Sequence, residues 1–370
     1  MVYDYPVLIR FFADNYRSLV NFELRPGRLN LLLGENGTGK TTIFNILGSL
    51  RDLVVLGLPV HDLFAFTRTS WDKRTVQRFE LDFQDDGGTY RYSLDVEHPA
   101  NKAPFIRSES IALDGEPLFR FTGGEVRLPY DDSTSATTFP FRSDQSYLVN
   151  LRSSNSGRID RLSRFIDLMA GISICQPNPF AMLPASERDQ DFLFRNGANF
   201  AAYFDHINDV NPAARRALET DLEKALPGFR NFRFDRLGST NSKVLFAVFG
   251  DSEHSGEFPL QNLSEGQRVL AILYSVLHGL TRKGSLLCFD EPDNFVSLTE
   301  IQPWLQTLRQ IVDERHAQAM VISHHPEVID YLALGSIWRF ERPLGPVIAE
   351  PYDPPGDPEL RLSEIIVRGG

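Results

Sequence analysis

One glycine-rich octapeptide constrains this chain more than any other segment. Residues 34–41 read GENGTGKT, an apolar run at residues 31–33 precedes them, and a helical pattern at residues 41–47 follows. Glycines let backbone N–H groups turn inward around an anion at φ angles that side chains resist, and the following helix adds the positive end of its dipole. A strand, such a loop and a helix in this order predict a phosphate-binding loop in an α/β fold.

The side chains of this loop have separate predicted roles. We expect Lys40 to reach the β- and γ-phosphates of ATP and the Thr41 hydroxyl to take one position around Mg²⁺. A glycine-rich turn that binds nothing is the alternative, and the strand and helix on either side argue against it. The other residues expected around the phosphates are Gly34, Glu35, Asn36, Gly37, Thr38, Gly39 and Thr42.

Two adjacent carboxylates end a second apolar run. Residues 285–289 read SLLCF, as expected for a buried parallel strand, and Asp290 and Glu291 follow. Parallel sheets bind ligands at the carboxyl ends of their strands. Asp290 therefore suits Mg²⁺, directly or through water, and Glu291 suits a general base that orients the attacking water. Two acids that only cap a strand are the alternative for this stretch considered alone.

A third motif, LSEGQ at residues 263–267, begins an apolar helix that we predict over residues 265–280. Ser264 and Gln267 have the spacing of a capping box, which satisfies N–H groups at a helix start. The same exposed N–H groups can bind phosphate, so the two roles are compatible. The position of the motif before the acidic strand favours a role at phosphate.

The order of these motifs, with SHH at residues 323–325, resembles that of the ABC-type ATPases, especially their SMC-like and RecF-like branch. The resemblance implies an α/β ABC-type P-loop ATPase head with a mixed β-sheet core and an inserted α+β lid subdomain. It also implies a head-to-tail homodimer around ATP and Mg²⁺, in which Ser264, Gly266 and Gln267 contact the γ-phosphate held by the opposite chain. His324 looks like the switch histidine that senses this phosphate.

Three longer stretches extend the resemblance: residues 8–42, 196–232 and 362–370. They are similar to stand-alone bacterial predicted ATPases close to the OLD-type ATPases, which often occur beside phage-defence or toxin–antitoxin genes. The resemblance thus implies an ATPase that regulates a partner effector, such as a nuclease or toxin encoded nearby.

Three positions depart from the family pattern. Glu265 replaces the usual second-position glycine of the signature, and Ser297 stands where many relatives carry the D-loop aspartate. The Q-loop glutamine is not evident, and Gln145 is the candidate for it. The last two departures concern the coupling of the lid to the site rather than nucleotide binding, whereas Glu265 would alter packing against the nucleotide.

The motifs divide the chain into four predicted parts. Residues 1–51 and 259–345 would form the two halves of the ATPase core, and residues 346–370 a tail. Between the halves, residues 52–258 are predicted to form an inserted lid of β-hairpins and helices, with a hairpin turn at residues 85–88.

Charge limits the classes of partner. The 370-residue chain has 38 Lys and Arg against 49 Asp and Glu, a net charge of −11. The net field of an acidic protein does not attract nucleic acid, so DNA binding would need a local basic patch. A solvated helix face explains the candidate arginines as well; they are Arg142, Arg152, Arg158, Arg161 and Arg164.

Other classes are disfavoured, and a reduced, cytoplasmic protein is expected. Cys175 and Cys288 cannot make a disulfide framework, and no apolar segment approaches the ~20 residues of a membrane span. An OLD-type nuclease would need more chain after His325 for its TOPRIM domain, and a transporter subunit is disfavoured by the long insert. A RecF-like DNA-repair ATPase stays the alternative to an effector-controlling ATPase.

Overall fold

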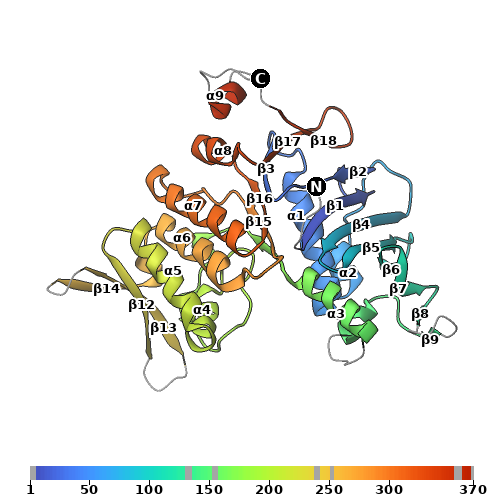
Figure 1. Ribbon diagram of the computed structural model, residues 1–370, viewed down its shortest axis with the longest axis horizontal. Helices are drawn as coiled ribbons and strands as arrows, with labels where there is room; N and C mark the ends of the chain where they lie inside the picture. The colour runs from blue at the N-terminus through green and yellow to red at the C-terminus, as the bar shows by residue number, and fades with distance from the viewer. Residues whose placement is uncertain are drawn as a thin grey trace.

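A six-stranded sheet forms the centre of the protein in a computed structural model, which describes residues 6–129, 136–151, 157–236, 242–250, 254–353 and 361–367. Its strand order is β10-β15-β16-β3-β17-β18, and only β18 runs antiparallel to its neighbour (Figure 1). The bounds are β10 (Ile172–Cys175), β15 (Leu286–Asp290), β16 (Gln318–Ile322), β3 (Leu29–Leu33), β17 (Ser336–Glu341) and β18 (Ile348–Pro351). The helices are α1 (Lys40–Arg51), α2 (Val60–Phe64), α3 (Gly157–Ala170), α4 (Phe200–Val210), α5 (Pro212–Ala225), α6 (Glu265–Ser275), α7 (Leu298–Glu314), α8 (Pro326–Leu332) and α9 (Leu362–Val367).

Successive residues of the central strands face two different apolar cores. On β3, Leu32 belongs to the core that includes α1 and the antiparallel strands, whereas Leu31 and Leu33 belong to the core that includes α6 and α7. Side chains alternate between the faces of a strand. Because both faces are covered, β15 is buried at every position, as its unbroken apolar run predicts.

A second, antiparallel sheet contains both the start of the chain and part of the predicted insert. Its order is β2-β1-β4-β5-β6-β7-β8-β9. The predicted hairpin is confirmed, since Asp85 pairs with Gly88 at the β4–β5 turn. The bounds are β1 (Val7–Asp14), β2 (Phe22–Leu24), β4 (Val76–Asp85), β5 (Gly88–Glu97), β6 (Phe105–Leu113), β7 (Glu116–Thr122), β8 (Glu125–Pro129) and β9 (Ala136–Pro140).

A helical part lies on the other side of the core, at the left of Figure 1. It contains α4, α5 and a small sheet of β11 (Ala185–Ser186), β12 (Phe229–Arg236), β13 (Lys243–Gly250) and β14 (Ser255–Pro259). Asn211 caps α5, because its side chain accepts the Ala214 N–H at 3.1 Å. Gly228, just after the helix, has φ +84°, a conformation that suits glycine at a helix end.

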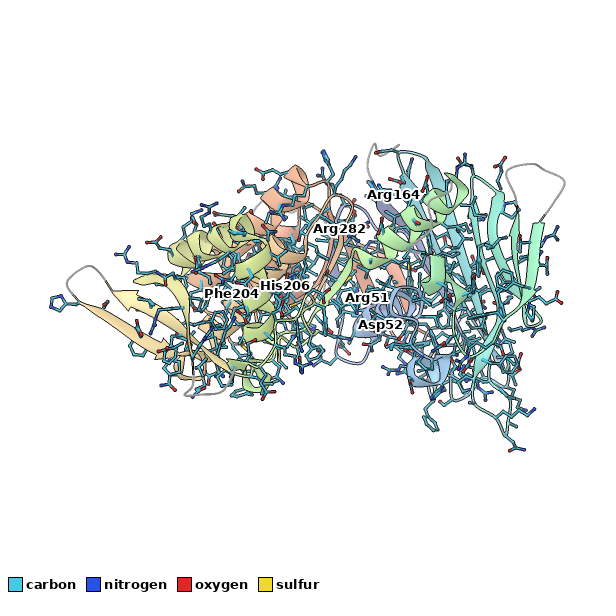
Figure 2. The ribbon with its side chains drawn as sticks, turned by 90° about the horizontal axis from the view of Figure 1, so that it is seen from below. Arg51, Asp52, Arg164, Phe204, His206 and Arg282 are labelled. Atoms are coloured by element: carbon cyan, nitrogen blue, oxygen red, sulfur yellow. The ribbon has the colours of Figure 1, made fainter. Side chains whose placement is uncertain are left out.

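Residues 52–258, which the sequence predicted to be one inserted lid, contribute strands to all three sheets. The hairpin strands from β4 onward extend the sheet of β1, and β10 pairs with β15 as a strand of the central sheet. Arg51 at the end of α1, labelled in Figure 2, donates to the Ile172 carbonyl of β10 at 3.0 Å and so joins this helix to the edge strand of the central sheet. Residue 52 is not an edge of the core, because α1 continues there directly into a π-helical segment, Asp52–Leu56, whose Leu53 and Val54 are buried. The division into separate domains stays a prediction.

Two further features concern the described residues alone. None of the helices within them is long and apolar enough to span a lipid bilayer. Both cysteines, Cys175 and Cys288, are buried free thiols on neighbouring central strands.

Glu109 is a buried carboxyl group in the antiparallel sheet. The Tyr92 hydroxyl donates to its Oε1 at 2.8 Å, and the Ser146 hydroxyl lies 2.9 Å from both carboxylate oxygens. Burial raises the pKa of Glu109 from its ordinary 4.5 to about 7, although these two hydrogen bonds act in the opposite direction. Between pH 4.5 and about 7, Glu109 is therefore protonated in the folded protein and ionised in the unfolded chain.

We expect the free energy of unfolding to fall as pH rises from 4.5 to about 7. In this interval the folded state binds more protons through Glu109 than the unfolded state does, so stability is lost as pH rises. The loss is on the order of 3 kcal/mol. Urea denaturation at a series of pH values measures it. Glu109→Gln keeps the shape of the side chain without ionising and should remove this part of the slope; an unchanged slope would contradict the assignment.

Candidate functional site

The carboxyl ends of β3, β15 and β16 meet at one edge of the central sheet, and each is followed by a predicted motif. The phosphate loop follows β3, Glu291 follows β15, and the SHH triplet follows β16. A cavity of about 470 Å³ opens there. Loop residues 36–42 and Glu291 line one part of it, and other lining residues include Arg17, Arg68, Trp71 and Arg342.

The phosphate loop needs its glycines for both conformation and space. Gly34 has φ +146°, and a Cβ there would lie 2.4 Å from the Phe340 carbonyl oxygen. Gly37 has φ +81° and no atom within 4 Å of its would-be Cβ, so the space above it is open. The Lys40 ammonium donates to the carbonyls of Gly34 and Glu35. Burial lowers the Lys40 pKa, an effect opposed by the charges of Glu291 and Asp290.

Thr41 and Asp290 form the candidate metal site. The Thr41 hydroxyl donates to Asp290 Oδ1 at 3.2 Å, and Asp290 is 2% exposed. Burial raises the Asp290 pKa, while the charge of Arg195 and the Thr41 hydrogen bond lower it. Hard oxygen ligands from one carboxylate and one hydroxyl, completed by phosphate oxygens, fit Mg²⁺. The described residues contain no group of three or more His, Cys, Asp or Glu that could hold a metal without a nucleotide.

Glu291 has an unusual backbone. Its φ is +51°, a left-handed conformation that costs a side-chain-bearing residue energy and is frequent at functional sites. The Glu291 N–H donates to the Ile322 carbonyl at 2.9 Å, and Asn294 Nδ2 donates to Glu291 Oε2 at 2.8 Å. These bonds hold the carboxylate at the cavity wall, as a general base requires.

The two histidines after β16 have different environments. His325 begins α8, and its Nδ1 accepts the Glu327 N–H at 3.2 Å. His324 is exposed and lines a hollow with Glu35 and Glu291. His324 thus lies beside Glu291, whereas His325 caps α8; a contact of His324 with the nucleotide stays a prediction.

The LSEGQ motif begins α6 with the predicted capping box. The Gln267 N–H donates to the Ser264 hydroxyl at 3.2 Å, and the Ser264 N–H donates to Gln267 Oε1 at 3.0 Å. Gly266 allows close packing, because a Cβ there would lie 2.7 Å from the Phe295 carbonyl oxygen. Among the described residues that line the 470 Å³ cavity, Ser264, Gly266 and Gln267 do not occur. Within one chain the signature motif is therefore outside the phosphate cavity.

Two residues that no motif indicated also lie at this edge of the sheet. Gln176 directly follows β10, the strand beside β15, so it shares the carboxyl edge with Asp290. Gln145, the Q-loop candidate, instead precedes Ser146, which bonds to Glu109 of the antiparallel sheet. The apolar run of residues 172–175 before Gln176 was the available signal.

The second of these residues is Arg195, whose Nη2 donates to Asp290 Oδ2 at 2.9 Å. It lies 95 residues before Asp290 in a segment without regular structure, so no local pattern indicates the contact. Ser297, at the D-loop position, donates to Glu300 Oε2 at 2.6 Å and caps α7.

The arginines considered for DNA binding are partly neutralised. On α3, Arg164 pairs with Asp85 at 2.6 Å (Figure 2), and Arg142 pairs with Asp144. Arg161 is exposed, whereas Arg152 and the side chain of Arg158 lie outside the described residues. The described arginines favour a solvated face over a nucleic-acid surface.

Comparison with protein families assigns the chain. Residues 29–330, from β3 into α8, match a family of AAA domains described as "AAA domain, putative AbiEii toxin, Type IV TA system". The chain belongs to this family. No curated protein matches the sequence.

Solved structures confirm the predicted fold of this AAA-family protein. An SMC head bound to the C-winged helix domain of ScpA has 13% identity and a TM-score of 0.56, covering 94% of this chain and 98% of its own. An SMC head with an extended coiled coil, bound to the C-terminal domain of ScpA from Pyrococcus furiosus, has 12% identity and a TM-score of 0.53, with 94% and 96% covered. The chain thus has the fold of these SMC heads, with the phosphate loop between β3 and α1.

Lys40→Ala should weaken ATP binding by about 10²-fold or more, because two or more charge-assisted hydrogen bonds to phosphate are lost. Titration calorimetry measures the affinity. Lys283→Ala, which removes an exposed ion pair with Asp86, is the matched control and should bind normally. Unchanged affinity of the Lys40 variant would show that the loop is not the phosphate site.

Proposed function

We propose that this protein is a Mg²⁺-dependent ATPase that closes as a head-to-tail homodimer around two ATP molecules and thereby controls a partner effector. The carrying observation is the separation of Ser264 from the cavity lined by Lys40, Thr41 and Glu291. A signature helix outside its own cavity can complete the site of a second copy.

Each residue has a distinct task in the proposed reaction. Lys40 and the loop N–H groups bind the phosphates, and Thr41 and Asp290 hold Mg²⁺. When bound, Mg²⁺ neutralises negative charge on the phosphate oxygens. Glu291 orients a water for attack on the γ-phosphate and accepts its proton. His324 contacts the γ-phosphate, and the partner chain covers it with its signature motif.

Control of an effector fits the remaining observations better than DNA repair. The family itself is described as "putative AbiEii toxin, Type IV TA system", which supports a toxin–antitoxin context, and the net charge of −11 disfavours nucleic acid. A nuclease or toxin encoded nearby, in phage defence or a toxin–antitoxin-like system, is therefore the proposed partner class. Two buried free thiols suit a reducing compartment, which supports a cytoplasmic location.

Glu291→Gln should separate binding from turnover. Glutamine keeps the shape of the side chain but cannot accept the proton of the water, so hydrolysis should fall ~10²–10⁴-fold with near-normal ATP affinity. The variant should accumulate as an ATP-bound dimer, seen by light scattering with and without ATP. A fully active enzyme that remains monomeric under turnover would contradict the dimer.

Mixing two inactive variants tests whether the site is shared between chains. Ser264→Arg blocks the signature side and Lys40→Ala the phosphate side, so each variant alone should be inactive. In a mixed head-to-tail dimer both lesions fall in one site and the other site is intact. Random mixing in equal amounts should restore about a quarter of the wild-type rate if the sites act independently. Full activity of Ser264→Arg alone would show that LSEGQ only caps α6 and has no role at the nucleotide.

A further inference from the structure

Arg195 gives the two oxygens of the Asp290 carboxylate different partners. Arg195 Nη2 donates to Oδ2 at 2.9 Å, whereas the Thr41 hydroxyl donates to Oδ1 at 3.2 Å. Arg195 Nη1 also donates to Asn45 Oδ1 on α1. One guanidinium thus joins the end of β15 to the helix that follows the phosphate loop.

The contact has a clear electrostatic reason. Asp290 is almost fully buried and adjoins a second carboxylate, Glu291. A buried carboxylate without a cation is costly, and a side chain in that position turns toward any available partner. The planar guanidinium of Arg195 offers donors in a fixed geometry, so it restrains the carboxylate plane as well as its charge.

The segment that carries Arg195 also contacts the edge of the central sheet and helix α6. The Arg195 carbonyl accepts the N–H of Gln176, the residue after β10, at 2.8 Å. Two residues further on, Gly197 packs against α6, since a Cβ there would lie 2.2 Å from Ile272 Cδ1. A movement of α6, the helix that begins with the signature motif, would therefore displace the segment whose Arg195 contacts Asp290.

We propose that Arg195 is a positioning residue for the metal-binding carboxylate. It holds Asp290 Oδ2 so that Oδ1 is presented beside Thr41, and its segment links this orientation to α6, the helix that begins with the signature motif. The inference rests on the proposed function, because it concerns the Mg²⁺ site of that reaction. Arg195 acts through Asp290, as outer partners of metal ligands commonly do.

The test separates metal affinity from nucleotide affinity. Fluorescent ADP is titrated into the full-length chain with EDTA, and Mn²⁺ binding to the ADP complex is then followed by electron paramagnetic resonance. Arg195→Gln should leave metal-free ADP binding within about twofold and weaken Mn²⁺ binding by about 10–100-fold, the usual effect of losing an outer partner. Arg195→Lys should recover part of the loss, because it restores a cation but not the fork that reaches Asn45.

Two further variants distinguish a specific loss of the Arg195 contact from a general effect of removing an arginine or of misfolding. Arg188→Gln removes an exposed arginine of the same segment and should change nothing. Asn45→Ala removes one of the two side-chain contacts of Arg195, leaves Asp290 intact, and should weaken Mn²⁺ binding by a smaller factor. It also serves as the test variant if Arg195→Gln fails to fold.

The outcomes are distinguishable. Normal Mn²⁺ affinity in Arg195→Gln and Asn45→Ala would overturn the inference and leave Arg195 a structural residue. A parallel loss of metal-free ADP binding would also overturn it, because the damage would then not be specific to the metal. If the wild-type chain showed no metal-dependent nucleotide binding, the proposed function itself would fail.

Discussion

The register of β15 between β10 and β16 is the constraint on which the rest of the site depends. Phe289 lies opposite Cys175, and Asp290 lies opposite Ile322. With both faces of β15 buried, a slip of one residue would exchange the two faces and turn the carboxylate away from α1. The pairing is thus held by apolar packing on each side of the sheet, and the chemistry at its edge depends on that packing.

Two adjacent carboxylates, Asp290 and Glu291, lie at the carboxyl edge of the central sheet and need cations nearby. Lys40 and Arg195 are cations that interact with these two carboxylates, and each is held by contacts from a different part of the fold. Lys40 belongs to the helix after the phosphate loop, and Arg195 to a segment beside the helical part. A bound nucleotide and its metal would change this balance, so the positions of both parts should respond to them. This is a physical route by which ATP could control a partner.

Much of this arrangement could be predicted from the sequence, because its signals are local. The glycine loop, the buried run before Asp290 and the Ser264–Gln267 capping box each lie within a few residues of the chain. The missed features are not local. The position of Gln176 beside the site follows only from the pairing of β10 with β15. The contact of Arg195 with Asp290 joins residues 95 positions apart in the sequence, so only the folded structure shows it. Residues 52–258 were predicted as one lid because hairpin patterns do not show which sheet a strand joins.

The central claim, that the signature motif of one chain faces the phosphate loop of another, is tested most directly by cross-linking. Ser264→Cys in one chain and Asn36→Cys in a differently tagged chain place exposed thiols on the two motifs, and the native cysteines are buried. With Glu291→Gln in both chains, a short bis-maleimide should link the two chains when ATP and Mg²⁺ are present and not in their absence. Failure to link under conditions where ATP is bound would contradict the shared site.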